Sequence, residues 1–124
     1  MPFDWTEYAR LAEDLRTRGD EASLRSAVSR AYYSVYHQAR NYLPAEGIEL
    51  SKTDSSHKVV WNRYKGIGGT SCRAVGVNGE RLNDNRTRAD YENELRNIES
   101  LVEETFKVAQ FILVYLEQCK SSRV

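Results

Sequence analysis

The sequence predicts an all-α protein, an antiparallel bundle of four to five helices that forms a single domain over residues 1–124. Three observations support this fold class. A chain of 124 residues is long enough for one hydrophobic core and too short for two. Apolar residues recur at helical spacing along most of the chain, and no stretch alternates long enough to form a strand. With 40% hydrophobic and 29% charged residues, the whole chain is expected to fold.

The first predicted helix covers about residues 5–18. Asp4 and Glu7 have the spacing of a capping box, and Gly19 provides a stop signal. Its apolar face is formed by Trp5, Tyr8, Ala12 and Leu15.

The second predicted helix is longer and covers about residues 21–43. Asp20 precedes it as an N-cap, and Pro44 and Gly47 end it. Its apolar face is formed by Leu24, Ala27, Val28, Ala31, Val35, Ala39 and Tyr42.

A shorter helix is expected next, with Ser55 or Ser56 as its N-cap and Gly66 at its end. Its apolar positions are Val59, Val60 and Tyr64. Residues 66–79 contain five of the seven glycines and show neither helical nor strand periodicity. We therefore expect a mobile loop over residues 66–79.

A helix is expected to resume near Glu80 and to carry the segment from Arg86 to Tyr91. The last helix should then run to about Gln118. Its apolar face is formed by Leu95, Ile98, Val102, Ala109, Ile112 and Leu116.

Charge and cysteine content exclude several classes of function. Net charge is zero, so the whole molecule is not drawn to DNA or to a membrane, yet residues 51–91 carry eight basic against four acidic residues. Cys72 and Cys119 form no CxxC pair or zinc-ligand cluster, so no metal and no cofactor are expected. The N-terminus lacks a signal sequence, and no apolar run could span a membrane. These features predict a cytoplasmic protein with reduced thiols.

A polar and aromatic stripe is predicted on one face of the second helix. It consists of Arg30, Tyr33, Ser34, His37 and Asn41. Ordinary exposed surface favours Lys and Glu, so this composition indicates a binding groove or a subunit interface. The alternative is a dimer seam, or a buried polar network, that binds no ligand.

A second motif, Arg86-Thr87-Arg88-Ala89-Asp90-Tyr91, follows about fifty residues later. On a helix, Arg86 and Asp90 are i,i+4 neighbours and could simply pair. The functional alternative has Arg86 bind a phosphate bidentately while Asp90 orients it. His57 lies near a predicted helix start, where it could reach a phosphate or could simply be exposed without a role.

The two motifs together resemble the HEPN family, the higher eukaryotes and prokaryotes nucleotide-binding domain, and above all its small stand-alone prokaryotic members. The likeness rests on residues 29–40, on the segment containing His57, and on the Arg-x-x-Ala-Asp-Tyr motif that begins at Arg86. It implies a helical bundle that forms a homodimer, often in toxin-antitoxin or defence systems. Many members are metal-independent ribonucleases whose motif has an Arg followed, four to six residues on, by a His. Here Arg86 matches the Arg, and no histidine follows it.

Three hypotheses remain open. In the first, the protein is a metal-independent endoribonuclease in which Arg86 stabilises the transition state, His37 replaces the missing histidine as the base, and Tyr91 orients the substrate. Arg30, Tyr33, Asn41, Arg88 and Asp90 would contribute to binding. In the second, the protein lacks catalysis and binds RNA, a nucleotide or a nucleotidyltransferase partner through the same surface. In the third, it is a dimeric helical scaffold.

Overall fold

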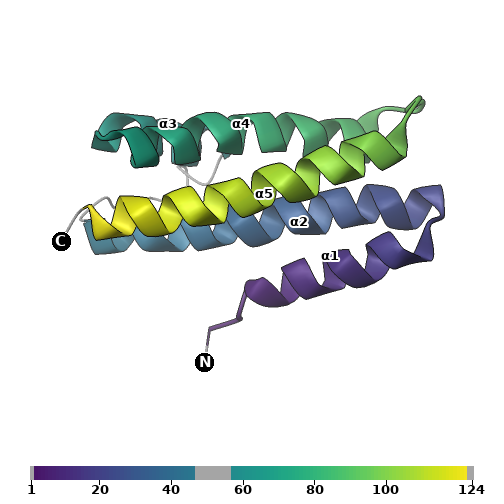
Figure 1. The fold of residues 1–124 in the computed structure, drawn as a ribbon, viewed down its shortest axis with the longest axis horizontal. Helices are drawn as coiled ribbons and strands as arrows, with labels where there is room; N and C mark the ends of the chain where they lie inside the picture. Colours follow the sequence, from purple (N-terminus) through teal and green to yellow (C-terminus); the bar gives the residue numbers. More distant parts are fainter. Residues whose placement is uncertain (1, 47–56, 123–124) are drawn as a thin grey trace.

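The computed structural model describes residues 2–46 and 57–122, and these residues form helices and turns without strands (Figure 1). The elements are α1 (Thr6–Arg18), α2 (Glu21–Tyr42), the short 3-10 helix η1 (Leu43–Glu46), α3 (His57–Ile67), α4 (Thr70–Tyr91) and α5 (Ile98–Ser121). The predicted all-α bundle is confirmed.

The helices pack side by side with their axes nearly aligned (Figure 1). Helices that follow one another through a short connection, α1 and α2, α3 and α4, and α4 and α5, are antiparallel. The central pair, α2 and α5, runs in the same direction. α1 lies on the outside against α2, and α3 covers the first half of α4.

The first two helices lie within one residue of their predicted limits. The side chain of Asp20 caps α2 by accepting a hydrogen bond from the backbone N–H of Ser23 at 3.0 Å. The predicted capping box of α1 is wrong, since Trp5 is the N-cap residue and no side chain caps it. The Asp4 carboxylate instead accepts two hydrogen bonds from Thr6, at 3.0 Å from its N–H and 2.6 Å from its hydroxyl.

The last helix begins at Ile98, where Asn97 caps it by accepting a hydrogen bond from the N–H of Ser100 at 3.2 Å. Leu95 precedes this helix and packs against a small apolar cluster at that end of the bundle. The helix continues to Ser121, slightly beyond the predicted end. The predicted N-caps of the third helix, Ser55 and Ser56, lie outside the described residues.

The main core joins α2, α3, α4 and α5. Its largest members are aromatic, and Tyr32, Trp61 and Tyr64 have no solvent exposure. The Tyr64 hydroxyl donates a hydrogen bond to the backbone carbonyl of Ala39 at 2.5 Å, which satisfies a buried polar group. α1 adds little to this core, since Ala12 is its one buried residue.

The predicted loop over residues 66–79 is wrong, because α4 already begins at Thr70. Only the turn at Gly68 and Gly69 is irregular, with positive φ angles of 101° and 90° that favour glycine. The later glycines are helical and lie against α3. A side chain at Gly79 would overlap the Trp61 indole, and a Cβ at Gly76 would lie 2.5 Å from the Trp61 carbonyl oxygen. Glycine is therefore required here for close helix packing.

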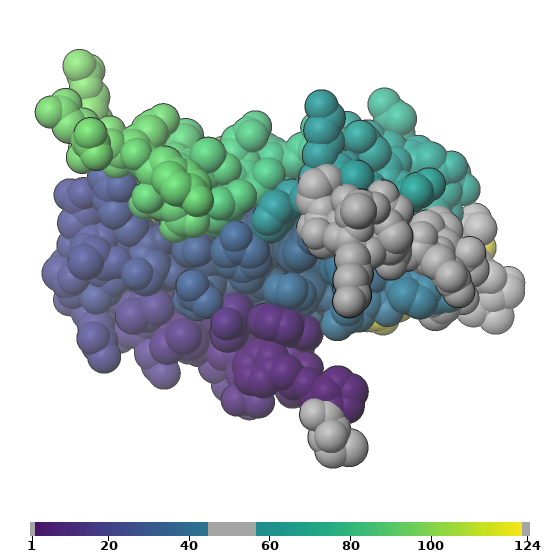
Figure 2. Space-filling view, turned by 180° about the vertical axis from the view of Figure 1, so that it is seen from behind, coloured from purple at the N-terminus to yellow at the C-terminus, as the bar shows by residue number. Residues whose placement is uncertain are grey.

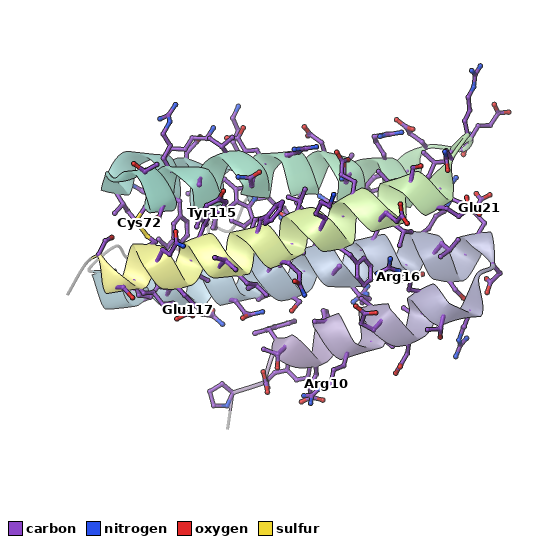
Figure 3. All side chains as sticks on the ribbon, in the orientation of Figure 1. Arg10, Arg16, Glu21, Cys72, Tyr115 and Glu117 are labelled. Atoms are coloured by element: carbon purple, nitrogen blue, oxygen red, sulfur yellow. A yellow bond between two sulfur atoms is a disulfide. The ribbon has the colours of Figure 1, made fainter. Side chains whose placement is uncertain are left out.

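Cys72 and Cys119 form a disulfide, so the expectation of reduced thiols is wrong. Although 47 residues separate them in sequence, the antiparallel course of α4 and α5 brings their Cα atoms to 4.8 Å. Figure 3 shows the bond beside the labelled Cys72, at the end of the bundle where α4 begins and α5 ends. Neither cysteine is exposed to solvent.

Candidate functional site

The candidate site occupies the face of the molecule on which α2 lies between α1 and α4 (Figure 2). Its side chains come from the middle of α2, the first turn of α3 and the last two turns of α4. These segments are far apart in sequence and meet because α4 packs along α2.

Arg86 is the centre of the site and is the one charged residue that is buried among those described, with 8% of its surface exposed. Its guanidinium lies over the rings of Tyr32 and Tyr33, 5.6 Å from each ring centre. Nη2 donates to the side-chain oxygen of Asn83 at 2.6 Å. Nε is buried and has no hydrogen-bond acceptor among the described residues. The guanidinium is thus positioned but incompletely bonded.

Asp90 is placed as predicted, one helical turn after Arg86. Its carboxylate lies 3.4 Å from Nη1 of Arg86 and 3.5 Å from the hydroxyl of Ser29. Both distances are long for hydrogen bonds, and the Asp90 side chain is 29% exposed. The pairing of Arg86 with Asp90 is therefore real but weak, and it leaves part of the guanidinium unused.

His57 is tied to this cluster by a chain of hydrogen bonds through the core. The indole N–H of Trp61 donates to the Tyr32 hydroxyl at 3.1 Å, and that hydroxyl lies 2.6 Å from Nδ1 of His57. Because the Tyr32 hydroxyl is buried, its proton needs an acceptor, and Nδ1 is the acceptor at hand. This arrangement places the remaining imidazole proton on Nε2, which makes Nε2–H the hydrogen-bond donor of the ring.

Burial lowers the pKa of His57, and the positive charge of Arg86 lowers it further. Burial also raises the pKa of the Tyr32 phenol, which stays protonated. The cluster at neutral pH therefore contains a guanidinium cation, a neutral imidazole and the neutral phenol of Tyr32.

A line of aromatic and basic side chains extends from this cluster toward the start of α1, and we call it the aromatic row. It consists of Phe3, Trp5, Tyr8, Arg30, Tyr33 and His37. The His37 ring stacks on the Trp5 indole, with centroids 3.5 Å apart and planes 10° apart. Arg30 lies over the rings of Tyr8 and Tyr33 at 4.8 Å and 5.9 Å.

The pKa of His37 is lowered by partial burial, then by the charge of Arg40 and by the neighbouring His57 when that ring is protonated. The His37 ring lies 6.2 Å from that of Tyr33, so Tyr33 stands between His37 and Arg86. No direct contact joins His37 to Arg86 in the part of the chain that the structure describes. His37 and Arg86 therefore lie on the same face of the molecule, but among the described residues no hydrogen bond connects them.

The remaining predicted site residues lie outside the cluster. Asn41 is exposed, and Arg88 is exposed and 3.6 Å from Glu92 in an i,i+4 pair. Tyr91 is 74% exposed at the end of α4. Ser34, which was predicted on the stripe, is buried and receives a hydrogen bond from Gln38.

The sequence left the role of His57 open, and the structure shows it half-buried rather than exposed. Sequence reasoning missed the contributions of Tyr32, Ser29 and Asn83. One signal for the role of His57 is present in the sequence. Trp61 follows His57 by one helical turn, which gives the imidazole an aromatic environment. That signal does not identify Tyr32 as its partner, since 25 residues separate them.

Comparison with protein-family models, curated proteins and solved structures finds no match to this chain. The resemblance to the HEPN family thus stays a prediction. Among the described residues, no helix is long and apolar enough to cross a membrane. The same residues contain no cluster of three or more His, Cys, Asp or Glu side chains that could hold a metal ion.

Proposed function

We propose that this is an RNA-directed protein of the HEPN type that binds an RNA phosphate at Arg86 and His57. The observation that carries the proposal is the buried Nε–H of Arg86, which lacks an acceptor among the described residues. Leaving a buried polar group unpaired costs about 1–3 kcal/mol, and more for a charged group. A phosphate oxygen is an acceptor of the right charge for the guanidinium, and it can approach the 9% of the Arg86 side chain that is exposed.

His57 supplies a second donor in the same cluster. With Nδ1 held by the Tyr32 hydroxyl, Nε2–H can donate to a phosphate oxygen beside the guanidinium. The same tautomer has no free lone pair for taking a proton, so the geometry at His57 favours binding over base catalysis. Arg30 and Arg40 add positive charge along the neighbouring face of α2.

The test is the affinity for a labelled single-stranded RNA, measured by fluorescence anisotropy over a salt series. Replacing Arg86→Lys keeps the charge and removes the Nε–H and the planar fork, so binding should weaken by about 1–3 kcal/mol. Arg88→Lys, on the exposed side of the same helix, is the matched control and should leave binding unchanged. Equal affinities for wild type and Arg86→Lys at every salt concentration would contradict the proposal.

A second candidate function is metal-independent RNA cleavage, with His37 as the base. It is favoured by the lowered pKa of His37, which keeps the imidazole unprotonated at neutral pH, and by its place across Tyr33 from Arg86. His37 would take the proton of the ribose 2′-OH as that oxygen attacks phosphorus. The 5′ oxygen would leave with a solvent proton, giving a 2′,3′-cyclic phosphate.

Labelled RNA incubated in EDTA tests this second function directly. Cleavage that is lost in both His37→Ala and Arg86→Lys supports it, and cleavage that survives His37→Ala removes His37 as the base. RNA that stays intact with wild type, in EDTA and with magnesium, leaves binding as the function.

A homodimer is part of the proposal, because half-exposed rings of α2 and α1 gather on one face. A nucleotidyltransferase or antitoxin is the class of protein partner that the resemblance implies. The disulfide between Cys72 and Cys119, a kind of bond that is rare in the cytosol, argues against the predicted cytoplasmic location. Sedimentation tests the dimer: the chain mass is 14.3 kDa, and a species of that mass at micromolar concentration would exclude it.

A further inference from the structure

The aromatic row carries exposed ring surface that the protein fold does not use. Phe3 is 48% exposed, and the rings of Trp5 and Tyr8 are half-exposed. Phe3 meets Trp5 and Tyr8 edge to face, with ring centroids 4.8 Å and 5.6 Å apart. Trp5 and Tyr8 meet in the same way at 5.1 Å. Three rings from the start of α1 thus form one cluster that stands at the surface.

The row is continuous with the phosphate site. Tyr33 lies beneath both Arg30, at 5.9 Å, and Arg86, at 5.6 Å. Arg30 also covers Tyr8, so it links the α1 rings to the guanidinium of Arg86 through Tyr33. Along α2, the seven helical steps from Arg30 to His37 span about 10 Å. This distance leaves room for bases next to a phosphate that is bound at Arg86.

Charge differs between the two ends of the row. The end near Arg86 carries the guanidiniums of Arg30 and Arg86, whereas at the Phe3 end the carboxylates of Asp4 and Glu7 are balanced by Arg10 beside Asp4 and Arg40 beside His37. A phosphate is therefore favoured at the first end over the second. Uncharged, flat groups suit the Phe3 end, and nucleobases are such groups.

We propose that the aromatic row stacks the bases of single-stranded RNA, so that the protein binds unpaired nucleotides next to the phosphate held at Arg86. This inference rests on the proposed function and names its substrate class. A duplex hides its base faces inside the helix and would offer only its backbone. Each base stacked on an aromatic side chain strengthens binding about fivefold or more.

The first experiment compares three probes of equal length by fluorescence anisotropy: oligoadenylate, the same ribose-phosphate chain without bases, and oligoadenylate annealed to oligouridylate. We expect oligoadenylate to bind at least about fivefold more tightly than either of the others. Equal binding of the intact and abasic chains, lost in Arg86→Lys, would overturn the aromatic row while leaving the phosphate site in place. Failure of wild type to bind any probe would remove both proposals.

The second experiment uses variants that do not disturb the core. Phe3→Ala should weaken oligoadenylate binding at least about fivefold and leave binding of the abasic chain unchanged, whereas Phe3→Tyr should retain affinity. Phe111→Ala is the matched control, because Phe111 is 50% exposed and lies on α5. Equal losses in Phe3→Ala and Phe111→Ala, or no loss in Phe3→Ala, would contradict base stacking at the row.

Discussion

The two halves of α4 use similar spacing of buried residues for different purposes. In residues 70–79 the buried positions are small or apolar, and Gly76 and Gly79 allow Trp61 of α3 to approach the backbone. In residues 80–91 the buried positions include Asn85 and Arg86, which need hydrogen-bond partners. The first half is specified by close packing and the second by polar chemistry. Asn85 finds its partners on α5, in Glu104 and Thr105, whereas Arg86 stays incompletely bonded and is the residue of this half available to a ligand.

The largest expected effect concerns the disulfide, which closes the first half of α4 onto α5. Replacing both cysteines, Cys72→Ser with Cys119→Ser, should lower the free energy of unfolding by about 4 kcal/mol, because a loop of 47 residues is no longer closed in the unfolded chain. Urea denaturation measures this difference. Ser71→Ala is the control, since it removes only an exposed hydrogen bond between the same two helices.

The second prediction tests the close packing of the same half. Gly79→Ala should destabilise the protein by about 2–3 kcal/mol, since the new methyl group overlaps the Trp61 ring. Gly66→Ala, in open space at the end of α3, should instead stabilise it by about 0.5 kcal/mol. Thermal unfolding followed by circular dichroism distinguishes the two. Similar effects at both glycines would show that packing against Trp61 does not explain their place in the helix.

The third prediction concerns the polar half and should leave stability nearly unchanged. Arg86→Met replaces a buried and incompletely bonded cation with an apolar side chain of similar length. The free energy of unfolding should stay within about 1 kcal/mol of wild type, while binding of RNA is lost. A large loss of stability in urea would mean that Arg86 holds the bundle together, and would remove the contrast between the halves.

The smallest expected effect is a dependence of stability on pH. The pKa values of His37 and His57 are lowered from 6.5 in the folded protein, so the unfolded chain binds more protons below about pH 6.5. Stability should therefore fall as pH falls from 7.5 to 5.5. The double variant His37→Gln with His57→Gln should show a smaller fall in urea denaturation. An equal fall in the variant would assign the effect to other groups.

Helix limits were largely predictable because apolar residues at helical spacing report the buried face directly. The start of α4 was not predictable from the sequence, because its glycines indicate a loop. Their helical packing can be recognised only when the residue that packs against them, Trp61, is known. The motif around Arg86 identified the centre of the candidate site and its neighbour Asp90. It could not show that Tyr32 links His57 to that centre, or that Trp5 covers His37, since both contacts depend on how distant helices pack.

The peripheral position of α1 has a consequence for motion. Its one buried residue is Ala12, it packs mainly against α2, and the disulfide joins α4 to α5 at a distance from it. Opening α1 leaves the core of α2, α3, α4 and α5 in place and should therefore require less free energy than unfolding the bundle. Amide protons of α1 should exchange with solvent as a separate cooperative unit, before those of α2 and α5. Because Trp5 leaves His37 in that opening, the imidazole becomes accessible without loss of the remaining fold.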